Sequence, residues 1–115
     1  VLMVGWGSIT HNPRAFSPPP PPIDAPAPAW VSGVTGWIAD RLAAGAIDDV
    51  LDAIERAPHG RDNHPTPDHI LPLFVAMGAG AEADGLAAKR LHDSVTYAVL
   101  AMDAYAFGSS RLASP

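Results

Sequence analysis

The chain has 115 residues, enough for one compact domain but not for two. Its net charge of −5, with only 7 scattered basic residues, excludes the clustered cations that nucleic-acid binding needs. The absence of cysteine excludes disulfide frameworks and thiolate metal sites, and no apolar run reaches the roughly 20 residues of a membrane span. We therefore expect a cytoplasmic protein without nucleic-acid or membrane partners.

The chain opens on a short apolar run, VLMVGWG, at residues 1–7. Such a run, bounded by glycine, predicts a strand buried on both faces, as in the parallel sheet of an α/β protein. Because a domain usually begins with a polar end, we expect residue 1 to lie mid-strand in the C-terminal part of a longer protein. A trimmed terminus or a missing initiator methionine is the alternative. His11 follows this strand, at the sheet edge where open α/β sheets bind ligands.

Residues 17–29, SPPPPPIDAPAPA, form a proline-rich loop. Proline has no backbone N–H and clashes with the preceding helical turn, so neither a helix nor a paired strand is expected here. The proline run at 18–22 favours an extended polyproline II conformation. We interpret it as a stiff surface connection rather than a ligand for an SH3-like groove, since no basic residue adjoins it to set its orientation. A wall of a site beside His11 is a further interpretation.

Two amphipathic helices are predicted next. Residues 30–44 place apolar side chains at helical spacing, and Gly45 is expected to end this helix. Residues 46–57 repeat the pattern, and Pro58 is expected to end the second helix. Both helices are expected to cover a sheet.

Three further elements complete the prediction. A helix is expected from about 67 to 77, in which Pro72 would produce a kink or a break. Residues 79–92 predict a loop and a short helix, whereas the alternating apolar residues of 94–108 predict a strand. The order of strand, helices and strand is typical of an α/β layer fold, and we treat residues 1–115 as a single partial domain.

Two of the five histidines are candidates for a metal site. If His69 is the third residue of its helix, unpaired N–H groups and the positive end of the helix dipole favour the neutral ring that binds metals. A partly exposed histidine that begins a helix is the alternative. His11 precedes Asn12 and Pro13, so a plain turn residue is its alternative.

The other three histidines carry weaker signals. His64 precedes Pro65 and is expected to be extended, so it is a candidate substrate-binding residue in the same cleft as His69. His59 lies in a polar loop, and His92 is expected on the surface at the start of a strand.

Three segments in order carry a family resemblance: GWGSITHNPR at 5–14, HPTPDHILPLFVAMGAG at 64–80 and LHDSVTYAVLAMDAYAFG at 91–108. Together they resemble the C-terminal half of class III extradiol ring-cleavage dioxygenases, in the branch of the 4,5-DOPA extradiol dioxygenases. The resemblance implies a three-layer α/β/α sheet fold, of which this chain is a C-terminal fragment.

The resemblance also implies roles for two histidines. His69 matches a metal ligand. His11 matches the histidine of a T-H-N motif, which implies either a further metal ligand or the acid/base residue, and both roles stay open. The family's two other histidine ligands are expected from a missing N-terminal half, so this chain alone is expected to be inactive.

The activity implied by the resemblance is the opening of a catechol ring by O₂ at mononuclear non-haem Fe(II), with Zn(II) as a second candidate metal in the isolated protein. The implied substrate is a small aromatic diol, DOPA-like or related. Trp6, Pro13 and Asp68 depart from the family pattern, which affects the expected pocket shape more than the metal site. The alternatives are a non-catalytic interaction module that uses the proline-rich loop, or an inactive fragment.

Overall fold

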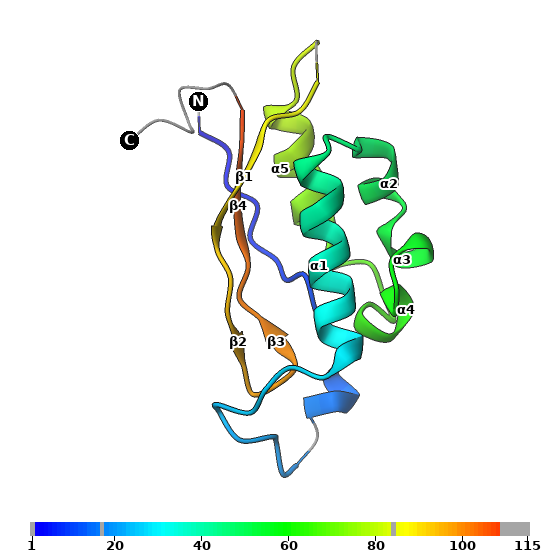
Figure 1. The fold of residues 1–115 in the computed structure, drawn as a ribbon, viewed down its shortest axis with the longest axis vertical. Helices are drawn as coiled ribbons and strands as arrows, with labels where there is room; N and C mark the ends of the chain where they lie inside the picture. Colours follow the sequence, from blue (N-terminus) through cyan, green and yellow to red (C-terminus); the bar gives the residue numbers. More distant parts are fainter. Residues whose placement is uncertain (1, 17, 84, 109–115) are drawn as a thin grey trace.

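The computed structural model describes residues 2–16, 18–83 and 85–108, and it shows a small mixed helix–strand domain. Helices lie on one side, strands lie on the other, and the N-terminal segment runs between them (Figure 1). The elements are a 3-10 turn η1 (Pro13–Phe16), helices α1 (Ala29–Ala43), α2 (Ile47–Leu51), α3 (Ala53–Arg56), α4 (Gly60–Asn63) and α5 (Leu71–Gly80), and strands β1 (Ala88–His92), β2 (Val95–Thr96), β3 (Leu100–Ala101) and β4 (Ala104–Phe107).

Helix α1 provides the centre of the apolar core. Its buried residues follow helical spacing and include Val34, Ile38 and Leu42. The helix ends in a Schellman motif. The N–H of Gly45 donates to the Leu42 carbonyl, and the N–H of Ala46 donates to the Arg41 carbonyl. Gly45 has a φ of 68°, a conformation that favours glycine. The predicted helix at 30–44 and its glycine stop are therefore confirmed.

The second predicted helix, at 46–57, is divided into α2 and α3. The two pieces meet at Asp52, whose φ of −102° and ψ of 23° leave the helical range. The Asp52 carboxylate accepts a hydrogen bond from Nε of Arg56 at 3.1 Å. Because apolar spacing is the same on both sides of this break, the sequence pattern does not reveal it. Helix α2 packs on α1 instead of covering a sheet directly.

Helix α5 begins later than predicted. It starts at Leu71, so Pro72 lies in its first turn. The missing N–H of proline costs no hydrogen bond there, and its fixed φ suits the helix. The expectation of a helix from 67 with a kink at Pro72 is therefore wrong, because proline serves as a helix start.

The predicted short helix within 79–92 is also wrong, because residues 88–92 form strand β1. Ala, Lys, Arg and Leu favour helices, but antiparallel pairing with β4 overrides that preference. Ala88 lies opposite Phe107, and the register shifts between Arg90 and His92.

The predicted strand at 94–108 is confirmed only in part, because it consists of three short strands. Strand β2 pairs with β3 through a turn in which Tyr97 and Ala98 have φ of 52° and 63°. Every strand pair among the described residues is antiparallel, so the parallel sheet that we expected is not observed there.

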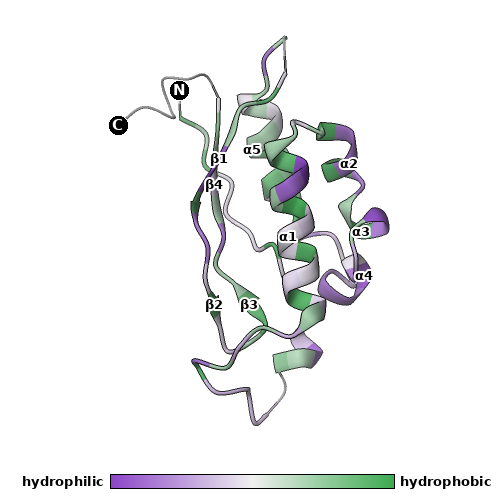
Figure 2. Cartoon of the chain, in the orientation of Figure 1, coloured by the Kyte–Doolittle hydropathy of each residue, from purple (hydrophilic) through white to green (hydrophobic). Residues whose placement is uncertain are grey.

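Residues 2–7 differ most from the prediction. They are extended but lie outside any strand, and Leu2, Val4 and Trp6 are 80%, 69% and 91% exposed. Gly5 and Gly7 lie against the start of α5, since a Cβ atom would come within 2.4 Å of the Pro72 carbonyl oxygen at Gly5 and of the His69 carbonyl oxygen at Gly7. Figure 2 shows the hydrophobic start of this segment in green. The prediction of a strand buried on both faces is wrong for residues 2–7, and Val1 lies outside the described residues.

The proline-rich loop packs on the rest of the molecule. Residues 18–28 contain neither helix nor strand, as predicted, while Ser17 lies outside the described residues and Ala29 already begins α1. The Ile23 carbonyl accepts a hydrogen bond from the N–H of Tyr97 at 3.0 Å. Among the described residues, none of the helices combines the length and the apolar composition that a membrane crossing requires.

Candidate functional site

Two segments that are distant in sequence are held together by hydrogen bonds. We call residues 8–12 and 62–69 the histidine clasp. Its cross-links are Ser8 N–H to His69 O (2.8 Å), His11 N–H to Asn63 O (2.8 Å), Asn12 Nδ2 to Asp62 O (2.6 Å) and His64 Nε2 to Ile9 O (2.6 Å). The clasp brings His11, His64 and His69 into one region, although each segment separately is a loop or a turn.

Buried polar side chains anchor the clasp to the fold. Thr10 is 1% exposed, its hydroxyl donates to the Val99 carbonyl at 2.9 Å, and it accepts the N–H of Ala101 at 2.9 Å. Asn63 is fully buried, and its Nδ2 donates to the Trp30 carbonyl at 2.7 Å. We did not predict either role. The only sequence signal was a polar residue beside each candidate histidine.

His11 and His69 are stacked face to face. Their ring centroids lie 3.4 Å apart, with an interplanar angle of 13°. Burial lowers the pKa of His11, the neighbouring His69 charge lowers it further, and the Asp68 carboxylate partly opposes both effects. The His11 ring is therefore held in its neutral form at lower pH than a free histidine.

His69 occupies a different position from the one predicted. It lies in the turn before α5, with Ile70 at the N-cap, so it is not the third residue of a helix. Its side chain is 42% exposed, and Nδ1 lies 3.5 Å from an Asp68 carboxylate oxygen without a hydrogen bond. The hydroxyl of Thr66 lowers the pKa of Asp68, which keeps this neighbouring carboxylate ionised.

His64 is buried, with 2% exposure. Burial lowers its pKa, although the hydrogen bond to the Ile9 carbonyl partly opposes that effect. Because a carbonyl only accepts, Nε2 must carry the proton, and Nδ1 holds a lone pair. This buried Nδ1 has no hydrogen-bond partner among the described residues. His64 therefore lies in the interior of the protein and does not line the open groove.

The two remaining histidines lie outside the clasp's ring cluster. His59 has its side chain 46% exposed, with Nδ1 3.1 Å from an Asp62 carboxylate oxygen. His92 is exposed at the end of β1, and its Nε2 lies 2.8 Å from the Ser94 hydroxyl. The surface position predicted for His92 is confirmed, but the predicted start of a strand is wrong, because His92 ends strand β1.

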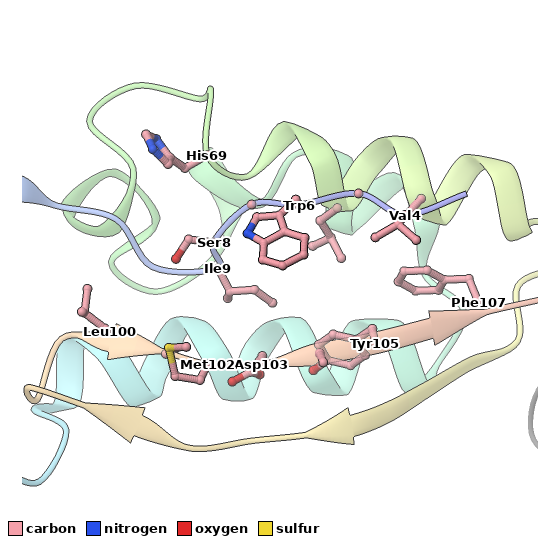
Figure 3. A pocket seen from close by; sticks show the side chains of 16 residues that line it. Val4, Trp6, Ser8, Ile9, His69, Leu100, Met102, Asp103, Tyr105 and Phe107 are labelled. Atoms are coloured by element: carbon pink, nitrogen blue, oxygen red, sulfur yellow. The ribbon is translucent and has the colours of Figure 1, made fainter. Parts of the chain in front are cut away.

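A groove of about 590 Å³ extends from His69 between residues 4–9 and the strands β3 and β4 (Figure 3). Asp103 lines it and forms an ion pair with Arg90 at 2.7 Å. Tyr105 also lines it, and its buried hydroxyl has no hydrogen-bond partner among the described residues. Burial raises the pKa of Tyr105 to about 12.

The imidazole nitrogens of the clasp are suitable metal ligands, but too few of them come together among the described residues to hold a metal ion. Neutral imidazoles suit iron and zinc, and the lowered pKa of His11 favours that form. His69 and His64 each have a buried Nδ1 without a hydrogen-bond partner in the described part of the chain. Within residues 2–16, 18–83 and 85–108, however, no group of three or more His, Cys, Asp or Glu is arranged to hold a metal ion. A complete site would need further ligands.

Comparison with known proteins identifies relatives of one kind. The chain is 34% identical to the 4,5-DOPA dioxygenase extradiol of Beta vulgaris over 110 residues, which are 96% of this chain and 39% of the relative. It is 40% identical to the protein of the same name from Portulaca grandiflora over 83 residues, 71% of this chain and 29% of the relative. No family model matches the chain.

A third relative, the 4,5-DOPA dioxygenase extradiol of Mirabilis jalapa, is 34% identical over 82 residues, again 29% of its length. The chain thus spans between 29% and 39% of the relatives that it matches. The match with the Beta vulgaris protein includes almost all of this chain, so it extends over all three segments that carried the resemblance. The chain belongs to the class III extradiol dioxygenases, in the branch of the 4,5-DOPA extradiol dioxygenases.

Proposed function

We propose that this chain is part of an enzyme that opens a catechol-type aromatic ring with O₂ at a mononuclear non-haem metal. The observation that carries the proposal is the His11–His69 stack at 3.4 Å, since it joins the two family motifs in space. The three-layer α/β/α fold, with this chain as its C-terminal portion, belongs to the same proposal. The chain itself supplies antiparallel strands with helices on one side.

In this proposal His69 binds the metal. Its side chain is 42% exposed and lines the groove, so a ligand can reach it. Fe(II) is the proposed metal, and Zn(II) is the alternative, because imidazole suits both. Two further histidine ligands would come from the part of the relatives that this chain does not match, which explains why two donors in the clasp are not enough. When bound, the metal would hold the diol and dioxygen together and lower the pKa of the diol.

His11 is proposed to move protons. Its neutral ring, favoured by burial, can accept the proton of a catechol hydroxyl and later return a proton to the ring-opened product. Both oxygen atoms of O₂ end in that product, a semialdehyde with a carboxylate. A ligand role for His11 is the second possibility for the same residue.

His64 was predicted to contact the substrate. Its burial and its hydrogen bond to Ile9 favour a supporting role, in which it holds the first clasp segment in position. A small aromatic diol stays the proposed substrate class, and the cytoplasm stays the proposed location.

The test uses a complemented chimera, which we define as the Beta vulgaris relative with this chain in place of its aligned region. Metal content and catechol-dependent oxygen uptake are measured on the chimera and its variants. We expect His69→Ala to lose both metal and uptake. If His11 is the acid/base residue, His11→Gln keeps the metal and loses uptake at least a hundredfold; if it is a ligand, the metal is lost as well.

His59→Gln is the matched control, since His59 lies outside the ring cluster and should keep both properties. A folded chimera that neither binds metal nor consumes oxygen would contradict the proposal for this chain. Metal and uptake that survive in His69→Ala would contradict the role of His69.

The alternative function is an interaction module built on the proline-rich loop. It predicts that a partner is lost when residues 18–22 are deleted, while the histidines are dispensable. The contacts of Ile23, Ala25 and Ala27 with the rest of the fold favour a connection over a free ligand segment.

A further inference from the structure

The groove beside residues 2–7 has two bare edges of extended backbone. On one side, the backbone of residues 2–7 forms no hydrogen bond with another strand within the described part of the chain. On the other side, β1 is the one strand that pairs with β4 in the part of the chain that the structure describes. Extended edges of this kind are templates for strand addition.

The alternation along β4 identifies which backbone groups face the groove. The N–H of Gly108 donates to the Ala87 carbonyl at 3.1 Å, on the β1 side. In an antiparallel ladder the direction alternates, so Ala106 also points toward β1 and Tyr105 points away from it. The backbone N–H and carbonyl of Tyr105 therefore face the side of β4 on which no strand is paired among the described residues, and Tyr105 also lines the groove.

The opposite edge, residues 2–7, is exposed along its whole length. Gly5 and Gly7 place residues 2–7 against α5, while Leu2, Val4 and Trp6 are exposed by 69% or more. A solvated segment with this apolar content is unusual, and it indicates a surface that another chain segment covers. Figure 3 shows Val4 and Trp6 beside the gap that separates this segment from β4.

We propose that the groove receives one extended strand, supplied by the part of the catalytic domain that the relatives possess and this chain does not match. The strand would pair with residues 2–7 on one side and with β4 on the other, and would join them into one sheet. The argument for this occupant is that the matched region is only 39% of the Beta vulgaris relative, which leaves most of that chain to cover the groove. A small molecule would not satisfy two rows of backbone groups.

This inference rests on family membership and not on the proposed chemistry. Its test therefore uses metal-free protein and involves no catechol. Hydrogen exchange is measured on the isolated chain and on the complemented chimera, with peptides that resolve Tyr105 from Ala106. In the isolated chain we expect fast exchange at Tyr105 and at residues 3–7, with slower exchange at Ala106. In the chimera we expect exchange at Tyr105 and residues 3–7 to slow at least tenfold.

Trp6→Asp sharpens the test, because Trp6 is 91% exposed in the chain and its loss should leave the isolated chain folded. In the chimera, the same charge within a filled groove should abolish the slow exchange at residues 3–7. Leu51→Asp is the matched control, since Leu51 is a half-exposed apolar residue of α2 outside the groove.

Fast exchange at Tyr105 in a folded chimera would overturn the inference. Equal protection in the isolated chain, together with a dimer mass by light scattering, would also overturn it by identifying a second copy of this chain as the occupant. A chimera in which Trp6→Asp retains full protection would show that the strand does not enter this groove.

Discussion

Residues 2–7 and residues 8–12 are consecutive in the chain but differ in their exposure to solvent. The first segment is apolar, yet Leu2, Val4 and Trp6 are exposed. The second is largely polar, yet Thr10 is 1% exposed. The difference is the presence of a partner. Hydrogen bonds to the 62–69 segment and to β3 hold the second segment, while the first lies against α5 and the turn before it and forms no backbone hydrogen bond with a strand among the described residues. Burial here follows available partners rather than hydrophobicity.

The largest expected effect comes from removing the anchor of the buried segment. Thr10→Val keeps the shape of the side chain but leaves the Val99 carbonyl and the Ala101 N–H unsatisfied. Since each orphaned group costs about 1–3 kcal/mol, we expect a loss of about 3 kcal/mol in the free energy of unfolding. Urea unfolding of the isolated chain measures it. A loss below about 0.5 kcal/mol would mean that the hydroxyl does not hold the clasp.

The second prediction concerns the protonation of the clasp. Burial lowers the pKa of His64 in the folded state, so the native chain binds fewer protons than the unfolded chain just below pH 6.5. The stability that neutral His64 contributes is therefore present above pH 6.5 and is lost as the pH falls through the folded pKa.

His64→Gln tests this prediction. The amide can still donate to the Ile9 carbonyl, so we expect a loss of about 1 kcal/mol at pH 7.5 and a weaker decline of stability below pH 6.5. Urea unfolding from pH 7.5 to pH 5 provides the comparison. If the variant loses stability below pH 6.5 as steeply as the parent chain, groups other than His64 cause that loss.

A third prediction concerns the groove wall. The Tyr105 pKa of about 12 lies above its ordinary value of 10.0, so the folded chain holds this proton more tightly than the unfolded chain. The corresponding stability is present below pH 10 and is lost as the pH rises toward 12. Tyr105→Phe should change stability at pH 8 by less than about 0.5 kcal/mol, because the hydroxyl has no hydrogen-bond partner among the residues that the structure describes.

The same variant should lose less stability between pH 8 and pH 11 than the parent chain. Ultraviolet absorbance of tyrosinate, followed together with unfolding, identifies the group responsible. A fall of more than about 1.5 kcal/mol at pH 8 would show that the Tyr105 hydroxyl has a partner after all.

The smallest effect is expected in the exposed segment. Leu2→Gln should change the stability of the isolated chain by less than about 0.5 kcal/mol, since Leu2 is 80% exposed. The same substitution in the complemented chimera should cost more, because a covering strand would bury that residue. Thermal melts of both proteins measure the difference. An equal change in melting temperature in the isolated chain and in the chimera would show that no strand covers residues 2–7 in the chimera.

Local patterns predicted the helical half better than the strands. The spacing of α1 and the stop at Gly45 are local features, and both were correct. Strand β1 was missed because Lys89, Arg90 and Leu91 favour helices, and only pairing with β4 selects the strand. Pro72 was misread because a proline inside an apolar run indicates a kink or a start equally well.

For the candidate site, the sequence motifs single out His11 and His69, and the roles of these two residues stay predictions. The motifs that contain His11 and His69 placed the chain in its family, and identity with the relatives confirmed that family. The stacking of these two rings, the burial of His64 and the anchoring of the loops by Thr10 and Asn63 follow from contacts between distant segments of the chain. The physical reason is that side-chain chemistry is a local property, whereas stacking, burial and the pairing of an exposed strand depend on partners distant in the chain.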